Sequence, residues 1–221
     1  MCGRYVLAKK PERVLAQLNL SEIPNFSPRW NIGPSQSAIV IVNDGMKTEI
    51  IEATWGLQQP QQIKKMLINA RMETVNVKPT FRSAFLKSRC LVLADGWYEW
   101  SAEKKPWYVK FLDDEIMSFG GLVFRGKDVS NFVIITTPST GSLSSIHHRQ
   151  PLVLPRERER KWLTSENQTF ESLLEPAPSE WFNWYRVSAQ VGSINNDHPG
   201  LIEPTSIDKK ILEEDKQGRF F

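Results

Sequence analysis

Alternating apolar and polar positions run through the middle of the chain and predict a series of β-strands. The clearest pair flanks Asn43-Asp44-Gly45, a sequence typical of the tight turn of a β-hairpin. Turn-forming residues also separate the later segments, as at Ser101–Lys105. The strands and extended segments expected from this pattern are Gly3–Leu7, Ala38–Val42, Lys47–Ala53, Arg89–Ala94, Trp107–Leu112, Ile116–Phe124, Phe132–Thr137 and Tyr185–Val191.

A helical spacing of apolar residues appears near the start of the chain and in the second half. Pro11 suits the first turn of a helix, and Val14, Leu15 and Leu18 then fall on one face. The run Pro155–Lys161 alternates in charge, so we expect a solvated helical face with exposed ion pairs. The expected helices are the one beginning at Pro11, Phe81–Lys87, Pro155–Thr164, Glu171–Leu174 and Ile207–Asp215, and Pro24–Pro34 is expected to be a loop.

These elements predict one mixed α+β domain. Strands dominate the middle of the chain, and helices fall at its ends and crossovers. The sequence shows no internal repeat, no low-complexity linker and no long block of one charge. A monomer is the default expectation for the oligomeric state.

Composition and charge add only broad limits. The chain has 221 residues, 40% of them hydrophobic and eight of them Trp, which suits a folded globule with a sizeable core. A net charge of +3 permits a local groove for an anionic ligand but does not require nucleic acid. The sequence has no secretory signal pattern and no long apolar run, so we expect a cytoplasmic protein with no membrane segment.

Two cysteines require separate explanations. Cys90 lies in the apolar strand Arg89–Ala94 and is expected to be a small buried hydrophobe. In a reducing compartment a disulfide between Cys2 and Cys90 is not expected, and their spacing does not fit a zinc site. We expect no metal and no cofactor.

Cys2 would become the terminal residue if Met1 were removed. Its α-amine and its thiol would then both be partly nucleophilic near neutral pH. Such an aminothiol condenses with an aldehyde to an imine, and the thiolate then closes a five-membered thiazolidine ring. An aldehyde-bearing ligand is the natural target. An acyl group is a second possibility, and an accidental cysteine at this position is a third.

Four segments of the sequence resemble one family when they are taken together and in order. They are Met1–Arg4, Ile68–Thr74, Ala94–Trp100 and Ile146–Leu154, and Leu201–Pro204 is similar to the family's closing segment. The family is that of the SOS-response-associated peptidases (SRAP), the abasic-site shield proteins. The resemblance places an SRAP domain at 1–204 and leaves 205–221 as a charged tail.

The resemblance implies both a fold and an activity. The fold is a compact domain with a highly curved, mixed, β-barrel-like central sheet flanked by helices. The activity is self-removal of Met1, followed by a thiazolidine cross-link between Cys2 and the aldehyde of an abasic site in single-stranded DNA. The expected partner is therefore abasic single-stranded DNA in the nucleoid, and a lyase side activity is compatible with this chemistry.

The same resemblance assigns roles to four residues. Cys2 is the nucleophile, Asn69 orients the terminal amine or the sugar, and Glu99 transfers protons during self-processing and imine formation. His147 protonates the sugar ring oxygen or the departing hydroxyl, whereas we expect no catalytic role for His148. Taken singly, these residues also suit structural roles: a turn for Asn69, a strand-end carboxylate facing water for Glu99 and a loop position for His147.

Other matching positions are expected to contact DNA. Arg4, Arg71 and Arg149 suit phosphates beside the lesion, although structural ion pairs remain an alternative for Arg4 and Arg71. Pro34 is expected to pack against a base, and Thr136 is a further contact position.

Two departures from the family pattern concern residues that bind DNA. Relatives often carry tryptophans soon after the pair Trp55-Gly56, where this chain has Leu57–Gln62. Losing such stacking costs about 1–3 kcal/mol per base, so we expect a weaker grip on that side of the lesion. Asn195 stands where relatives tend to place a basic residue nearby, and one phosphate contact is expected to be missing there.

Two further functions remain open at this point, and one further partner. A cysteine peptidase or amidase would act on other chains through Cys2, and a non-covalent single-strand-binding module would not use Cys2 at all. The end of the tail, Gln217–Phe221, is similar to peptides that dock on DNA sliding clamps. Folding of its two Phe onto the domain is the alternative.

Overall fold

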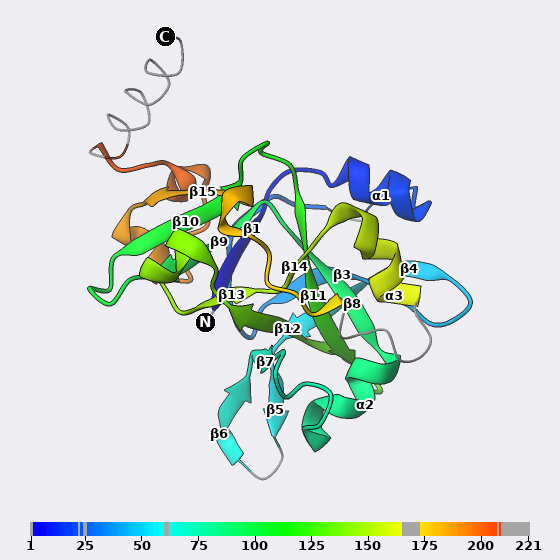
Figure 1. Cartoon of the computed structure of the whole chain (residues 1–221). Helices are drawn as coiled ribbons and strands as arrows, with labels where there is room; N and C mark the ends of the chain where they lie inside the picture. The colour runs from blue at the N-terminus through cyan, green and yellow to red at the C-terminus, as the bar shows by residue number, and fades with distance from the viewer. Residues whose placement is uncertain are drawn as a thin grey trace.

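The computed structural model describes residues 2–21, 23, 26–59, 62–164, 173–206 and 208. Two strongly curved β-sheets make up most of this part, with short helices on the outside (Figure 1). The mixed α+β class and the highly curved mixed sheet flanked by helices, which the family resemblance implied, are confirmed.

Five strands of the larger sheet close into a barrel. Each pairs with the next, and the last returns to the first: β12 runs parallel to β4 and antiparallel to β11. A closed ring has no free edges, which accounts for the near-complete burial of its inner strands. In order around the ring the strands are β3 (Ser37–Asn43), β8 (Arg89–Ala94), β11 (Met117–Phe124), β12 (Asn131–Pro138) and β4 (Thr48–Trp55).

Two short strands extend this barrel beside β12. β7 (Asn69–Arg71) runs parallel to β12, and β13 (Arg149–Pro151) runs antiparallel to it. β14 (Val153–Leu154) follows β13 and pairs with β11. A separate ribbon of β5 (Leu57–Gln59) and β6 (Gln62–Leu67) projects from the body next to β7 (Figure 1).

The second sheet carries the start of the chain. Its strand order is β15 (Phe182–Arg186), β10 (Pro106–Phe111), β9 (Gly96–Trp100), β1 (Arg4–Leu7) and β2 (Arg29–Ile32). β1 lies between β9 and β2 and is antiparallel to both. The N-terminal strand is therefore an inner strand, and the sheet holds it on both sides.

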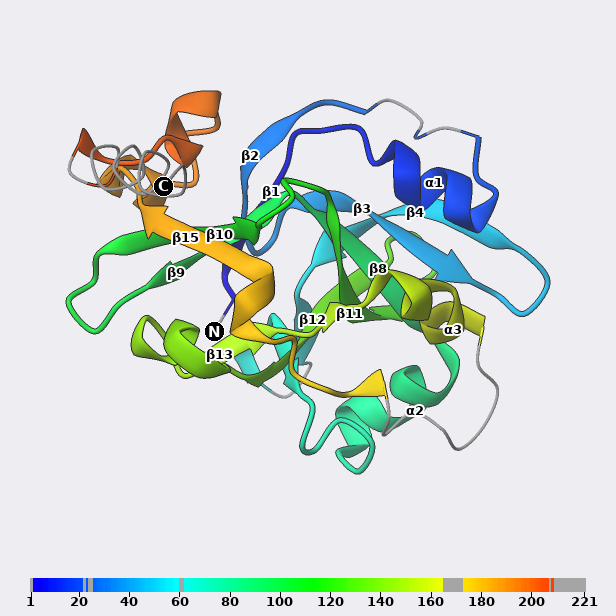
Figure 2. The same ribbon diagram turned by 45° about the horizontal axis from the view of Figure 1, so that its top comes forward.

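In the described part of the chain, three α-helices cover the outside of the barrel (Figure 2). They are α1 (Glu12–Leu18), α2 (Pro79–Lys87) and α3 (Glu159–Thr164). In α1 the buried residues are Val14, Leu15 and Leu18, the apolar face expected from the sequence. Short 3-10 turns lie at Gly141–Ser145, Arg156–Arg158, Ser179–Trp181, Ala189–Gly192 and Pro199–Ile202.

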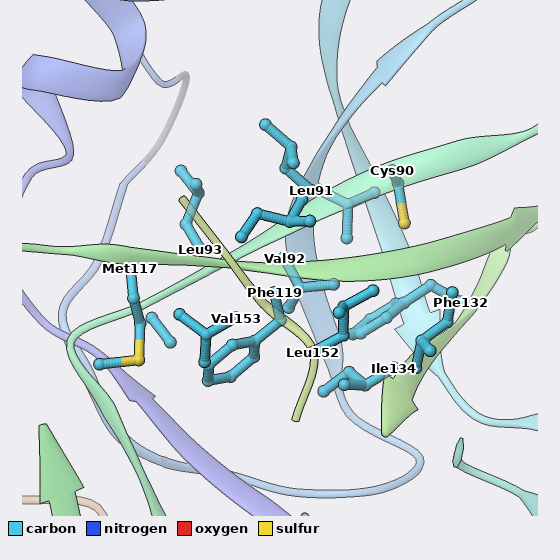
Figure 3. Close-up of a cluster of buried hydrophobic side chains, with 14 of the residues drawn as sticks. Cys90, Leu91, Val92, Leu93, Met117, Phe119, Phe132, Ile134, Leu152 and Val153 are labelled. Carbon is cyan, nitrogen blue, oxygen red and sulfur yellow. The ribbon is translucent and has the colours of Figure 1, made fainter. Parts of the chain in front are cut away.

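Aliphatic and aromatic side chains from β8, β11 and β12 belong to one buried hydrophobic cluster (Figure 3). Cys90 is fully buried among them, as expected. Gly121 allows this packing, because a Cβ there would lie 2.9 Å from the Cys90 sulfur.

The structure corrects three expectations. Arg29–Ile32 forms β2 inside the segment that was expected to be a loop, because β1 offers it an edge to pair with. The extended segment 185–191 ends at Arg186, and Ala189–Gly192 is a 3-10 turn. The expected helix Pro155–Thr164 begins as a 3-10 turn before α3.

The expectation of a solvated charged face is wrong at Glu159. Its side chain is 1% exposed and accepts hydrogen bonds from both Arg13 Nη atoms, at 3.2 and 3.3 Å, and from Ser118 Oγ at 2.8 Å. The residue belongs to a buried ion pair that fastens α1 to α3. The sequence could not show this, since its partners lie far away along the chain.

Several predictions lie outside the described residues. They are residues 171 and 172 of the expected helix Glu171–Leu174, all residues but Asp208 of the expected helix Ile207–Asp215, and the expected clamp-binding segment Gln217–Phe221.

Candidate active site

Cys2 lies where the two sheets meet. It precedes β1, whose Arg4 is paired with Tyr98 of β9, and so it lies beside the end of β9. The side chain is 0% exposed, and its Sγ is 4.0 Å from the carbonyl oxygen of Arg4. Burial, and next the negative charge of Glu99, raise the pKa of the Cys2 thiol well above its ordinary value. At neutral pH the buried sulfur is therefore a thiol.

Asn69 reaches Cys2 from the barrel. β7 runs parallel to β12, with Asn69 opposite Ile134. Its Nδ2 donates a hydrogen bond of 2.8 Å to the carbonyl oxygen of Cys2. Its Oδ1 is buried and accepts no hydrogen bond in the described part of the chain. This amide therefore fixes the backbone of Cys2 and keeps one acceptor available for a further donor.

Glu99 comes from β9 and is almost completely buried, with 4% of the residue exposed. Burial raises the pKa of its carboxyl to about 7. A carboxyl with this pKa is present in both forms near neutral pH, so it can accept and return a proton. The expectation of a desolvated, proton-exchanging group fits this geometry, and the alternative of a strand-end carboxylate facing water is wrong.

His147 lies directly before β13 and is partly buried. Its Nδ1 is 3.9 Å from Glu99 Oε2 and 3.0 Å from the backbone nitrogen of Arg149. The same Nδ1 is 3.1 Å from the Arg149 carbonyl oxygen, so it can accept from the Arg149 N–H or donate to that carbonyl, according to the tautomer of the ring. Burial lowers the pKa of His147. The ring of His148 stacks on it, with 4.4 Å between the centroids.

The Arg4 side chain contacts β2 and the 3-10 turn Ala189–Gly192. Its Nη1 donates to Asn31 Oδ1 and to the Val191 carbonyl, both at 3.0 Å, and its Nη2 donates to the Gly192 carbonyl at 3.3 Å. All three acceptors are neutral, so its charge is available to an anion. Gly33 makes room for this side chain, because a Cβ there would lie 2.9 Å from Arg4 Nε.

The other expected DNA contacts differ in accessibility. Arg71 is exposed and Pro34 is partly exposed. Thr136 is fully buried, and Arg149 is 7% exposed and bound to Glu73. The structure thus places Arg71 and Pro34 at the surface, and Thr136 and Arg149 beneath it.

Two polar residues of this region received no role from the sequence. Glu73 follows β7 and binds Arg149 in a bidentate ion pair. Asn31 is fully buried, and its Nδ2 lies within hydrogen-bond distance of three carbonyls, those of Val191, Ser193 and Asn196. Glu73 lies within the family segment Ile68–Thr74, and Asn31 lies three residues before Pro34, but the partners of both are distant in sequence.

Two surface cavities, of about 290 and 380 Å³, are lined by other residues, those around Arg29 and Ile51 and those around Leu112 and Trp181. Among the described residues, no group of His, Cys, Asp and Glu has the arrangement of a metal site. No helix in the described part is long and apolar enough to span a bilayer.

The fold thus places Cys2, Asn69, Glu99 and His147, which come from separate elements, close together beside a curved mixed barrel. The family model described as SOS response associated peptidase (SRAP) matches residues 1–194, and the chain belongs to this family.

Relatives and solved structures agree with this assignment. The chain is 33% identical to the abasic site processing protein YoqW of Bacillus subtilis, over 92% of this chain and 99% of the relative. It is 30% identical to YedK of Escherichia coli, described in the same words, over 92% of this chain and 100% of the relative. A crystal structure from Bacteroides thetaiotaomicron matches with a TM-score of 0.76 and 26% identity, covering 92% of this chain and all of that one.

Proposed function

We propose that this protein processes abasic sites in single-stranded DNA by forming a covalent thiazolidine between Cys2 and the aldehyde of the opened sugar. The observation that carries the proposal is the convergence on Cys2 of Asn69, 2.8 Å from its carbonyl oxygen, and of the buried carboxyl of Glu99. The relatives named as abasic site processing proteins support the choice of substrate.

The first step is hydrolysis of the Met1–Cys2 peptide bond, which consumes one water and releases methionine. Cys2 is 0% exposed before this step. Asn69 binds the Cys2 carbonyl oxygen and holds the backbone that must be processed. Glu99 can accept a proton from the attacking group and deliver it to the nitrogen of Cys2, which becomes the new α-amine.

The second step joins the new α-amine to the aldehyde. The nitrogen attacks the sugar carbon, and loss of one water leaves an imine. Glu99, whose pKa is raised to about 7, can supply the proton that the departing hydroxyl needs, and His147, whose Nδ1 is 3.9 Å from Glu99 Oε2, is the second candidate donor.

The third step closes the ring. The Cys2 sulfur adds to the imine carbon, its proton leaves for the Glu99 carboxylate, and the ring nitrogen takes up a proton. The raised pKa of the thiol makes this transfer to a base necessary. The closed thiazolidine contains no imine bond, so the cross-link hydrolyses slowly and the protein continues to cover the lesion.

Arginines near Cys2 are the proposed phosphate contacts. Arg4 carries a charge that neutral carbonyls and an amide hold in place, and Arg71 is exposed after β7. Pro34 offers an apolar surface next to Gly33 and Arg4. This combination of cations and a flat apolar surface suits a single strand.

A denaturing gel tests the proposal. Wild type and Cys2→Ala are incubated with abasic single-stranded DNA, with intact DNA and with unrelated peptides. A heat-stable shifted band that needs both wild-type protein and abasic DNA is the expected result, and intact mass should show loss of one methionine. Peptide cleavage without cross-linking would indicate a conventional cysteine peptidase. Binding that is equal in both proteins and never covalent would indicate a simple single-strand binder.

A further inference from the structure

Asn31 is a completely buried amide in a polar cluster beside Arg4. It lies on β2, which pairs with β1, the strand that carries Arg4. Its Oδ1 accepts a hydrogen bond of 3.0 Å from Arg4 Nη1. Its Nδ2 lies 3.2, 2.9 and 2.8 Å from three backbone carbonyls of one distant segment, those of Val191, Ser193 and Asn196. A single side chain thus connects the Arg4 guanidinium to that segment.

The segment 191–197 is also attached to β2 at a second point. The Asp197 carboxylate pairs with Arg29 Nε at 2.5 Å and accepts the backbone N–H of Trp30 at 2.5 Å. Arg4 itself donates to two carbonyls of the segment, at 3.0 and 3.3 Å. The segment therefore has a fixed position against β2, and its carbonyls help to define where the guanidinium lies.

The three acceptors that hold Arg4 in the described part of the chain are uncharged. They are the Asn31 amide oxygen and two backbone carbonyls, so the guanidinium keeps its full positive charge. Burial lowers the pKa of Arg4, as expected for a cation that has lost part of its water. An Asp at position 31 would have the same shape, but it would neutralise Arg4 and could not donate to the carbonyls. The amide is therefore the group that fixes this cation and leaves its charge to an external anion.

The cluster lies beside the surface expected to bind DNA. Gly33 follows β2, and a Cβ there would lie 2.9 Å from Arg4 Nε and 2.9 Å from Ile194 Cδ1. The next residue, Pro34, is partly exposed. Arg4 and the segment 191–197 therefore both lie against Gly33, directly before the proline proposed to contact a base.

We infer that Asn31 is a positioning residue for DNA binding, which holds the Arg4 guanidinium in place and fully charged for a phosphate beside the lesion. The inference rests on the proposed function, in which Arg4 contacts the single strand. Asn31 is completely buried, so it acts through Arg4. A guanidinium that is already oriented loses less conformational entropy when the phosphate binds.

The experiment measures the affinity for a single strand with a tetrahydrofuran site, which has no aldehyde and keeps binding separate from cross-linking. Fluorescence anisotropy gives the dissociation constant at several salt concentrations. The proteins are wild type, Asn31→Asp, Asn31→Ser, Arg4→Gln and the double variant with Arg4→Gln and Asn31→Ser. Asn43→Asp is the matched control, because Asn43 is the last residue of β3, and the first, Ser37, comes four residues after Gly33. The control thus adds the same charge at the opposite end of that strand.

Asn31→Asp should bind with a smaller salt dependence. Each phosphate contact to a single strand contributes about 0.7 to the slope of log K against log salt, and the new carboxylate should remove that contribution by neutralising Arg4. At a salt concentration of about 0.1 M the same loss corresponds to roughly 5-fold weaker binding. Arg4→Gln should show the same two changes, and the Asn43→Asp control should show neither.

Asn31→Ser should also weaken binding, because the guanidinium loses its side-chain acceptor and the segment 191–197 loses an anchor. The double variant should bind as Arg4→Gln does, since a residue that acts through Arg4 has no effect in its absence. A role in stability alone would leave the salt slope unchanged, and urea unfolding of each variant measures that role separately.

Two results would overturn the inference. One is a wild-type salt slope in Asn31→Asp. The other is a double variant weaker than Arg4→Gln by the full factor of Asn31→Ser, which would show that Asn31 affects binding independently of Arg4. If Asn31→Ser does not fold, Asn31→Asp carries the test, because it keeps the volume of the side chain. Absence of cross-linking to an aldehyde-bearing strand in the wild type would instead refute the proposed function.

Discussion

Replacement of Glu99 by glutamine should stabilise the protein in alkaline solution while it abolishes the chemistry. The carboxyl of Glu99 has an ordinary pKa of 4.5 and a pKa of about 7 in the folded chain, where 4% of the residue is exposed. The folded state therefore holds this proton more tightly than the unfolded state does. Stability contributed by the proton is complete below pH 4.5 and is lost as the pH rises through 7.

The size of the effect follows from these two values. At pH 8 the ionised carboxylate costs the folded state about 3 kcal/mol, and at pH 5 about 1 kcal/mol. A neutral amide in its place would carry no such penalty, so Glu99→Gln should raise the free energy of unfolding by about 3 kcal/mol at pH 8 and by much less at pH 5. The same variant should cross-link abasic DNA far more slowly, because it cannot accept a proton.

Urea unfolding, followed by the fluorescence of the eight tryptophans, measures the difference at the two pH values. Glu52→Gln is the control, because Glu52 is exposed on β4 and should show no comparable dependence on pH. A gain in Glu99→Gln that is equal at pH 5 and pH 8, or a loss at pH 8, would refute the reasoning.

Three further predictions concern groups around the barrel and the site. Tyr5→Phe should raise the free energy of unfolding by about 1 kcal/mol in urea, because the buried Tyr5 hydroxyl has no hydrogen-bond partner in the described structure; a clear loss would contradict this. Arg13→Met should lower it by about 3 kcal/mol, since the Glu159 carboxylate would stay buried without its cation, and Glu159→Gln in the same chain should recover part of the loss. Gly33→Ala should weaken binding to single-stranded DNA, measured by fluorescence anisotropy, with little change in unfolding; equal affinity would argue against a phosphate contact by Arg4.

Much of the local structure was predictable because it depends on neighbouring residues. The Asn43-Asp44-Gly45 turn defines the β3–β4 hairpin, and the spacing of Val14, Leu15 and Leu18 defines the buried face of α1. β2 was missed because its four alternating residues, Arg29–Ile32, lie within a segment rich in Pro and Asn, and they become a strand by pairing with β1. Short strands of this kind depend on a partner strand that cannot be identified from the local sequence.

The residue types of the candidate site could be predicted from the sequence, but several of their contacts could not. Cys2 at the start of the chain suggested an aminothiol, and the motifs around Asn69, Glu99 and His147 supplied its expected neighbours. The DNA contact expected for Arg149 followed from its charge and from its place in a motif of the family. The sequence did not show that this arginine pairs with Glu73.

The sequence by itself determined the hairpin, the amphipathic helix, the apolar strands and the choice of Cys2 as the candidate nucleophile, since each depends on the chemistry of a few adjacent positions. Only the tertiary structure decided that Glu99 is desolvated, that Glu159 is a buried partner of Arg13 and that Thr136 joins three strands. The physical reason is that burial and hydrogen bonding are properties of the whole fold. A carboxylate becomes a proton carrier, an ion pair or a solvated surface group according to which distant segments close over it.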